Sequence, residues 1–241
     1  MSGLLALVGG AEFTPGNEPC DRRLVAAAGG GPALIVPTAA ARQAPERAVA
    51  TATRWFAGLG LQVDELMVLC RGDAASAALA DRARAARLLY LTGGDPGLVV
   101  SVLRGSRVWQ AMLDAWQAGA ALAGSSAGAM ALCESVLLLE RWPDHRRRRH
   151  APGIGVVPGV ALIPHFDTFG AGWVESALAG ASEAVAALLG VDERSACLWD
   201  GSRWLSTGPG AVTLIDTRGT AARFEAGEAV AGLPPPASVT A

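Results

Sequence analysis

Short apolar runs alternate with amphipathic stretches along most of the chain. A short apolar run closed by glycine or proline is typical of a buried strand, whereas apolar residues that recur every three or four positions indicate a helix. We therefore expect strands at residues 4–8, 33–36, 61–69, 88–91, 118–123 and 156–163. We expect helices at residues 18–28, 45–58, 74–87, 98–103, 108–117, 129–133 and 173–189. Shorter β segments are expected at residues 196–199, 211–215 and 221–224.

This order of elements predicts the α/β class. Strands that alternate with helices form a mostly parallel central sheet with helices on both faces. The last short strands predict a small β extension near the C-terminus. A length of 241 residues suits one domain of this kind. We assign residues 1–231 to a single α/β domain and expect the Pro-rich residues 232–241 to be a disordered tail.

The pattern breaks at residues 140–150, which are polar and show no apolar period. Residues 146–149 are all arginine, and a histidine flanks them on each side. We predict that this segment is a mobile flap over the site. Arginine suits two-point binding of a carboxylate, so the run would favour acidic substrates. A solvated loop without a function is the plainer interpretation, and it stays open at this point.

Composition and charge exclude several classes of function. The chain is 51% apolar with a net charge of -2, which is typical of a globular protein and argues against nucleic-acid binding. No apolar run approaches the roughly 20 residues that span a membrane. The four cysteines are scattered, so we expect reduced thiols and a cytoplasmic location. All 20 basic residues are arginine, which rules out mechanisms that need a lysine. We expect neither a metal nor an organic cofactor.

Candidate chemistry centres on the sequence Gly-Ser-Ser-Ala-Gly at residues 124–128. An apolar run precedes it and a helical pattern follows, which is the strand–turn–helix context of a nucleophile elbow. Ser126 would then be the nucleophile, and the amide of Ala127 would lie at the start of a helix, where it can stabilise an oxyanion. The alternative is a tight turn in which Ser126 only caps the helix.

A serine nucleophile needs a base, and the chain has three histidines. His165 follows an apolar strand and would therefore lie at the same edge of the sheet as the elbow. His145 and His150 belong to the arginine-rich segment, where a mobile loop would orient a base poorly. We predict His165 as the general base.

The base needs a carboxylate to orient it, and spacing alone leaves the choice open. Asp167 lies two residues after the histidine, so its reach to the ring is uncertain. Asp192 and Glu193 open a later strand near the sheet edge. Glu140 follows the elbow helix and is a further option.

Three stretches together resemble the cyanophycinase and dipeptidase E family of serine peptidases. They are Thr-Gly-Gly-Asp at 92–95, Gly-Ser-Ser-Ala-Gly-Ala at 124–129 and Pro-His-Phe-Asp at 164–167. Residues 5–12 and 190–196 look like the cyanophycinase branch. The fold of this family is similar to that of class I glutamine amidotransferases. A glutamine amidotransferase itself would need a cysteine where this chain has Ser126.

The resemblance implies roles for particular residues. Ser126 would be the nucleophile, His165 the base and Glu193 the third member of the triad. Gly94 and Ala127 match the amides of the oxyanion hole. We take as further candidates, for substrate binding, Gly93, Asp95, Asp167, Arg146 and Arg147.

The resemblance also implies a substrate class. Cyanophycinases carry Asp-Gln before the histidine, whereas this chain has Ile-Pro at 163–164, a context closer to dipeptidase E. We therefore expect hydrolysis of small, aspartyl-containing peptides through an acyl-enzyme. A catalytically silent module that binds a metabolite or partner remains an alternative, as does an esterase-type hydrolase. The expected partner is a small peptide, with no nucleic acid and no membrane, and a homodimer is left open.

Overall fold

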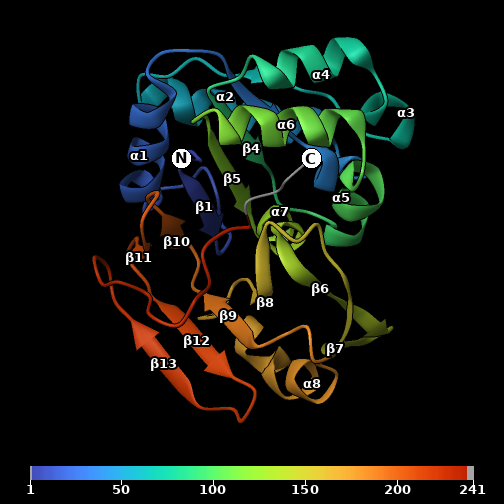
Figure 1. Ribbon diagram of the computed structural model, residues 1–241, viewed down its shortest axis with the longest axis vertical. Coiled ribbons are helices and arrows are strands. Elements are labelled where there is room, and N and C mark those ends of the chain that lie inside the picture. The colour runs from blue at the N-terminus through green and yellow to red at the C-terminus, as the bar shows by residue number, and fades with distance from the viewer. Residues whose placement is uncertain (1, 238–241) are drawn as a thin grey trace.

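The computed structural model describes residues 2–237 and contains two β-sheets, which form the upper and lower parts of the molecule in Figure 1. The upper sheet has seven strands, in the order β11 (Trp204–Thr207), β10 (Ala196–Trp199), β1 (Leu5–Val8), β5 (Ala121–Ser125), β4 (Leu88–Leu91), β2 (Ala33–Val36) and β3 (Asp64–Glu65). The five strands from β1 to β3 run parallel, and β10 and β11 add an antiparallel edge. The predicted α/β class with a mostly parallel central sheet is confirmed.

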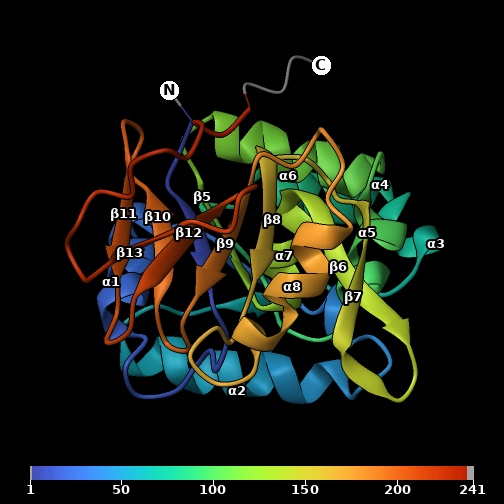
Figure 2. The same ribbon diagram turned by 90° about the horizontal axis from the view of Figure 1, so that it is seen from below.

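Helices cover both faces of the upper sheet because its strands are apolar on both sides. Successive residues of a strand point to opposite faces. In β1, Ala6 and Val8 pack in one core with helices α1 (Glu18–Ala28) and α2 (Pro45–Gly58). Leu5 and Leu7 pack in the other core, which contains residues of α3 (Arg71–Ala74), α4 (Ala77–Arg84), α5 (Pro96–Leu103), α6 (Arg107–Gln117) and α7 (Ala127–Leu132). Figure 2 shows α2 and α6 on opposite sides of the strands.

The lower sheet has six strands, in the order β13 (Ala221–Phe224), β12 (Val212–Asp216), β9 (Ala187–Val191), β8 (Val157–Ile163), β6 (Cys133–Arg141) and β7 (Asp144–Pro152). Its central strands β6, β8 and β9 are parallel to one another. Of the short β segments expected towards the C-terminus, those at 211–215 and 221–224 extend this second sheet, whereas the one at 196–199 is β10 of the upper sheet. Helix α8 (Val174–Ala179) lies against β7, and two 3₁₀ turns occur at Thr38–Ala40 and Gly170–Trp173.

The prediction of a long helix at residues 173–189 is wrong. Helix α8 ends at Ala179, and residues 187–191 form strand β9. Ala187 pairs with Val160 of β8 on one side and with Asp216 of β12 on the other. Alanine and leucine favour a helix locally, but burial between two neighbouring strands outweighs that preference.

The mobile flap expected at residues 140–150 is an antiparallel hairpin of β6 and β7. Leu138 pairs with Arg149, and Leu137 pairs with His150. The arginines therefore belong to a strand whose side chains alternate between two faces. The search for an apolar period missed this strand because β7 lies at the edge of the sheet and is mostly exposed.

Two other elements are shorter than expected. The strand expected at residues 61–69 is reduced to β3, two exposed residues at the edge of the sheet. The helix expected at residues 74–87 is shortened to α4, and Ala74 instead ends the separate short helix α3. Ser76 begins α4, because its hydroxyl accepts a hydrogen bond from the amide of Leu79 and so caps that helix.

The expected disordered tail, residues 232–241, falls partly within the described chain. The carbonyl of Pro234 accepts a hydrogen bond from Trp204 Nε1 at 2.8 Å, and the amide of Ala237 donates to Val156 at 2.8 Å. Residues 238–241 lie outside the described residues.

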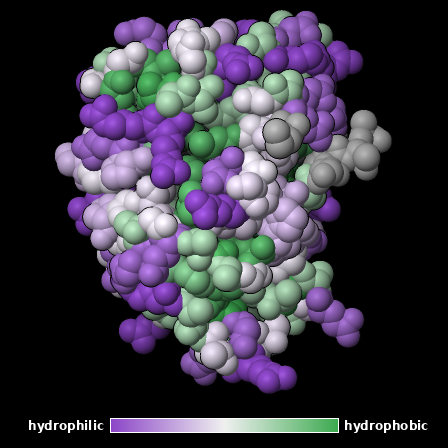
Figure 3. Space-filling view, turned by 60° about the vertical axis from the view of Figure 1, so that its left-hand side comes forward, coloured by the Kyte–Doolittle hydropathy of each residue, from purple (hydrophilic) through white to green (hydrophobic). Residues whose placement is uncertain are grey.

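The surface carries few large apolar side chains. Trp142, at the end of the β6–β7 hairpin, and Phe169 are exposed. On the face in Figure 3, apolar residues show through in small areas between hydrophilic ones. Among residues 2–237, none of the helices is long and apolar enough to span a bilayer.

One buried carboxyl group links stability to pH. Asp21 of α1 is 1% exposed, and its Oδ2 accepts a hydrogen bond from Trp55 Nε1 at 2.7 Å. Burial raises the pKa of Asp21 to about 7, and the charges of Glu18 and Glu12 act in the same direction. The folded protein therefore holds this proton more tightly than the unfolded chain does. This contribution to stability is present at pH 4, and it is lost as the pH rises towards 7.

We expect Asp21→Asn to remove this pH dependence. The amide oxygen can still accept the hydrogen bond from Trp55, but the side chain no longer ionises. The free energy of unfolding of the variant, relative to the parent, should rise by on the order of a few kcal/mol between pH 4 and pH 8. Chemical denaturation at several pH values measures it, with the exposed Asp81→Asn as control. Parallel pH curves for Asp21→Asn and the parent would contradict the expectation.

Candidate active site

The turn at residues 124–128 connects β5 to α7, as expected for an elbow. Ser126 has φ 47° and ψ -108°, a positive φ that non-glycine residues seldom adopt. A Cβ on Gly124 would lie 2.6 Å from the backbone of Gly128, and one on Gly128 would lie 2.5 Å from the carbonyl oxygen of Leu91. Both glycines are therefore required by close packing, which explains the spacing of the motif.

His165 lies at the end of β8, and its ring faces Ser126. The amide of His165 donates to the carbonyl of Gly9 at 2.7 Å, which holds the loop against the upper sheet. His165 Nε2 lies 3.1 Å from Ser126 Oγ. The ring of Phe169 stacks on the imidazole at 4.8 Å. The imidazole also requires glycine at position 10, since a Cβ there would lie 2.3 Å from His165 Cε1.

Glu193 completes a hydrogen-bonded chain through the imidazole. Its Oε1 lies 2.8 Å from His165 Nδ1, and both side chains are less than one quarter exposed. The amide of Glu193 donates to Asp167 Oδ1 at 2.9 Å. Asp167, expected to bind substrate, therefore contacts the loop that carries Glu193.

The other carboxylates considered for this position lie elsewhere. Asp192 is buried, and its Oδ2 accepts a hydrogen bond from the amide of Ala211 at 2.9 Å. Glu140 forms an ion pair with Arg147 at 2.9 Å in the β6–β7 hairpin. Of the carboxylates considered, Glu193 is the one that the structure brings to His165.

The other two histidines also have separate partners. His145 packs edge-on against Trp142, with ring centroids 4.9 Å apart. His150 Nδ1 lies 2.8 Å from Ser135 Oγ, and its Nε2 lies 2.8 Å from the carbonyl of Ala177. These contacts hold the hairpin to α8.

The Thr-Gly-Gly-Asp stretch follows β4 and lies beside the elbow. Gly94 has φ 142°, and a Cβ there would lie 2.3 Å from the carbonyl oxygen of Ala39. A Cβ on Gly93 would lie 3.5 Å from Ser126 Cβ. Asp95, expected to bind substrate, caps helix α5, since its Oδ1 accepts a hydrogen bond from the amide of Leu98 at 3.1 Å.

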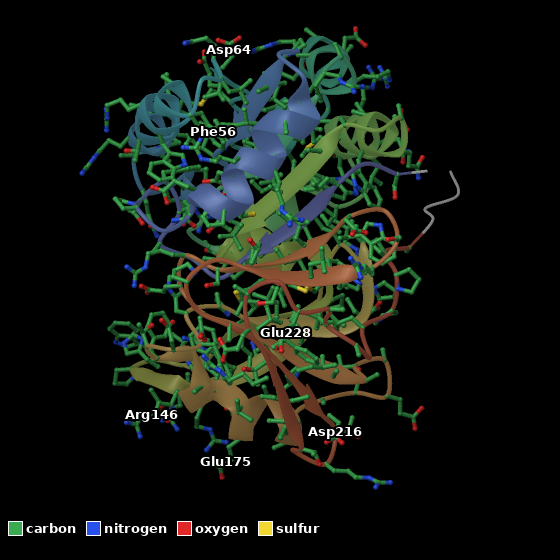
Figure 4. The ribbon with its side chains drawn as sticks, turned by 90° about the vertical axis from the view of Figure 1, so that its left-hand side faces the viewer. Phe56, Asp64, Arg146, Glu175, Asp216 and Glu228 are labelled. Atoms are coloured by element: carbon green, nitrogen blue, oxygen red, sulfur yellow. The ribbon has the colours of Figure 1, made fainter. Side chains whose placement is uncertain are left out.

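The arginine-rich strand borders a cavity whose lining includes Phe169, the residue that stacks on His165. The cavity measures about 820 Å³ and is lined by His145, Arg146, Arg148, Thr168, Phe169, Gly172 and Trp173. The Arg148 guanidinium lies 3.7 Å from the centre of the Trp173 ring, and burial lowers the pKa of Arg148. Arg146 lies at the same end of the molecule as Glu175 of α8 (Figure 4). The ion pair with Glu140 raises the pKa of Arg147.

Two residues near the site were missed by the sequence analysis. Glu12 accepts hydrogen bonds from the amide of Gly93 and the hydroxyl of Ser125, both at 2.8 Å. A carboxylate two residues after the glycine pair that follows β1 was an available signal for it. Phe169 carried no signal of its own before its stacking on His165 was seen. Arg148 belonged to the arginine run but was not distinguished within it, because its contact with Trp173 depends on the fold. Within residues 2–237, no cluster of three or more His, Cys, Asp or Glu could hold a metal.

An elbow serine hydrogen-bonded to a histidine at the edge of a parallel sheet is an arrangement found in serine hydrolases. Residues 4–206 match the model of peptidase family S51. The chain belongs to this family and is a serine-type peptidase, which confirms the family resemblance predicted from the sequence.

Two solved structures are similar to this one. A peptidase from an acI-B1 Actinobacterium is 29% identical, with a TM-score of 0.82 over 95% of this chain and 97% of that one. A putative peptidase E protein from Listeria monocytogenes EGD-e is 16% identical, with a TM-score of 0.64 over 86% of this chain and 99% of that one, and it shows the fold alone. No curated protein sequence matches the chain significantly.

Proposed function

We propose that this peptidase hydrolyses small, aspartyl-containing peptides through Ser126, His165 and Glu193. The observation that carries the proposal is the hydrogen-bonded chain from Ser126 Oγ to His165 Nε2 at 3.1 Å and from His165 Nδ1 to Glu193 at 2.8 Å. With the ring proton on Nδ1, donated to Glu193, the unprotonated Nε2 can accept the serine proton.

The first half of the reaction forms an acyl-enzyme. Ser126 Oγ attacks the carbonyl carbon of the peptide bond while His165 Nε2 takes the hydroxyl proton. The amides of Gly94 and Ala127 stabilise the oxyanion, a contribution of about 3 kcal/mol per donor. When the carbon–nitrogen bond breaks, His165 gives its proton to the leaving amine.

The second half releases the acid product. Water loses a proton to His165 Nε2 and attacks the ester carbonyl, and the ester bond to Ser126 breaks as the proton returns to Oγ. Throughout both halves the Glu193 carboxylate holds the ring orientation and stabilises the imidazolium form of the histidine.

The chain order supports a peptidase of this type over an α/β-hydrolase esterase. In those esterases the acid lies between the serine and the histidine in sequence. Here the carboxylate in contact with the ring is Glu193, which follows His165. A silent binding module would retain the elbow but would have no reactive serine.

Labelling and turnover together test the proposal. A fluorophosphonate probe should modify Ser126, detected by peptide mapping, and the protein should cleave Asp-Xaa peptides from a panel that also contains β-aspartyl, blocked and Asn-Xaa peptides. Labelling with cleavage of esters alone would favour an esterase. No labelling at Ser126 would favour a binding module.

We expect Glu193→Gln to lower kcat by about 10³- to 10⁴-fold. Glutamine has nearly the same shape, but its amide can donate to Nδ1 and so favour the wrong ring tautomer, and it cannot stabilise the imidazolium. Steady-state kinetics on an Asp-Xaa peptide measure the loss. Glu140→Gln is the matched control, because it removes a carboxylate whose partner is Arg147. A large loss in Glu140→Gln with a normal Glu193→Gln would transfer the role to Glu140.

The basic cavity supports the preference for acidic substrates. Arg146 and Arg148 line it, and it lies next to Phe169, which stacks on the imidazole of His165. Arg147 is partly neutralised by Glu140. We therefore assign carboxylate binding to Arg148 and Arg146 rather than to the pair Arg146 and Arg147 proposed from sequence.

We expect Arg148→Gln to reduce the preference for Asp-Xaa over Asn-Xaa by about 10-fold in kcat/KM, because a charge-assisted hydrogen bond in a half-buried position is lost. High salt should also reduce the parent's preference for Asp-Xaa over Asn-Xaa, because salt screens the attraction between the arginine and the carboxylate. Arg149→Gln is the control, since neighbouring residues on a strand point to opposite faces. An unchanged ratio in Arg148→Gln would leave the arginine run without a role in substrate choice.

Four free cysteines support a cytoplasmic location, which is part of the proposal. Cys20, Cys133 and Cys197 are buried, and burial raises the pKa of each thiol, while Cys70 is exposed. Unpaired thiols are usual in reducing compartments.

A further inference from the structure

Glu193 is carried by a tight turn between β9 of the lower sheet and β10 of the upper sheet. The amide of Ser195 donates to the carbonyl of Asp192 at 3.2 Å, which closes the turn around Glu193 and Arg194. Arg194 has φ 58°, a conformation that a non-glycine residue keeps only where the surrounding contacts hold it. The position of Glu193 therefore depends on the bonds that join this turn to other segments.

Two neighbouring residues of the turn are held in different ways. The amide of Arg194 donates to the carbonyl of Gly10 at 3.0 Å, so backbone holds backbone. The amide of Glu193 instead donates to a side chain, the Oδ1 of Asp167, at 2.9 Å. The residue that carries the carboxylate at the imidazole is thus attached to the site through the carboxylate of another residue.

Asp167 comes from the loop that carries the base. It lies two residues after His165, which also has a positive φ, of 50°. Asp167 binds the amide of Glu193, and Glu193 Oε1 lies 2.8 Å from His165 Nδ1, so the contacts form a closed ring through the two loops. Within this ring the Asp167 carboxylate sets the distance between the loop of the base and the turn of the acid.

We propose that Asp167 is a positioning residue: it holds the turn of Glu193 against the loop of His165 and makes no contact with the substrate. The inference rests on the proposed function. The next two residues, Thr168 and Phe169, line the cavity assigned to carboxylate binding, whereas Asp167 does not. A negative side chain would also repel the carboxylate of an aspartyl substrate. The sequence-based prediction that Asp167 binds substrate is replaced by this role.

Other roles for Asp167 make different predictions. A positioning residue acts through Glu193, so its loss lowers kcat, leaves KM nearly unchanged and has little further effect once Glu193 has been disabled. The loss of a group that binds the substrate raises KM. The loss of a contact that serves only stability lowers the free energy of unfolding and leaves kcat unchanged.

The experiment compares Asp167→Ala and Asp167→Asn, each alone and combined with Glu193→Gln, by steady-state kinetics on an Asp-Xaa peptide and by chemical denaturation. Alanine removes the acceptor, whereas the amide oxygen of asparagine can still accept from the amide of Glu193. Asp200→Ala is the matched control. Asp200 is likewise exposed and accepts backbone hydrogen bonds, from Ser202 at 2.9 Å and Arg203 at 3.0 Å, but it follows the opposite end of β10.

We expect Asp167→Ala to lower kcat by about 10- to 100-fold with KM nearly unchanged, because a small displacement of Glu193 misaligns the base. The loss should stay below the one expected for Glu193→Gln, since the carboxylate is displaced and not removed. Asp167→Asn should keep kcat near that of the parent. Asp167→Ala added to Glu193→Gln should leave kcat close to that of Glu193→Gln alone. Asp200→Ala should keep the kcat of the parent.

Several results would overturn the inference. A raised KM with normal kcat in Asp167→Ala would indicate substrate binding, and a loss of stability alone would indicate a structural contact. An equal loss of kcat in Asp167→Asn would assign the effect to the charge. An undiminished loss in the Glu193→Gln background would show that Asp167 does not act through Glu193. If Asp167→Ala does not fold, Asp167→Leu takes its place, because leucine keeps the branched shape without an acceptor, and a normal kcat in that variant contradicts the proposal.

A fluorophosphonate separates this inference from the proposed function. If the probe labels Ser126 of the parent, and Asp167→Ala is labelled and turns over as the parent does, only this inference fails. If Ser126 of the parent is not labelled, the proposed function fails as well.

Discussion

Ser126→Ala is expected to lower kcat on Asp-Xaa peptides by at least about 10⁴-fold, the loss typical when a serine nucleophile is removed from a triad. The reason is that no other hydroxyl occupies the position 3.1 Å from His165 Nε2. Stability should change by about 0.5 kcal/mol or less, since the side chain is partly exposed and has no role in either core. Steady-state kinetics and chemical denaturation measure the two quantities.

Ser125→Ala is the informative comparison for this variant. Ser125 is buried on β5, and its hydroxyl donates to Glu12. Losing that hydrogen bond should cost about 1 kcal/mol of stability and far less activity than the loss of Ser126. Full activity in Ser126→Ala would refute the assignment of the nucleophile, and inactivation by Ser125→Ala alone would transfer that role to the neighbouring serine.

His165→Ala is expected to lower kcat by a comparable factor, because Ser126 then has no base within hydrogen-bonding distance. The same variant should react slowly with a fluorophosphonate, since the serine is no longer activated. Both rates can be measured on one preparation. Phe169 would lose its stacking partner, so a modest drop in stability is also expected.

The two other histidines provide matched controls. His145→Ala removes a surface contact with Trp142 and should leave activity and stability near those of the parent. His150→Ala removes contacts to Ser135 and Ala177 and should cost about 1 kcal/mol of stability per hydrogen bond, with activity retained. An essential His145 or His150 together with a dispensable His165 would contradict the proposed mechanism.

The elements predicted best are the strands that are buried on both faces of the sheet. Strands β1, β2 and β4 are short, fully buried runs, so their sequences are apolar throughout. The fold class followed from the alternation of these strands with helices, and the family resemblance followed from motifs at the strand ends. Gly124 and Gly128 are required by backbone contacts within a few residues of the elbow or on the neighbouring strand. The spacing of the glycines in the sequence is therefore enough to identify the turn.

Pairing between strands decided the elements that were predicted incorrectly. Residues 187–191 have a helical composition, yet β9 is stabilised by hydrogen bonds to β8 and β12. Strand β7 consists largely of charged residues and is a strand because β6 pairs with it. The partners of β9 are distant in sequence, so no local pattern indicates that pairing. The β6–β7 hairpin is local, but the exposed charged residues of β7 hide it from a search for apolar positions.

At the site, local patterns were enough to predict the turn that carries Ser126 and the position of His165 at the end of a strand. Both depend on local backbone geometry, which the order of glycines and apolar residues specifies. Only the tertiary structure decided between Glu140, Asp192 and Glu193 as the carboxylate at the imidazole, and only it brought Glu12 to the elbow. The chain must fold before a side chain 113 residues away can approach Ser125, so the local pattern can mark Glu12 as a carboxylate after a strand but cannot specify this contact.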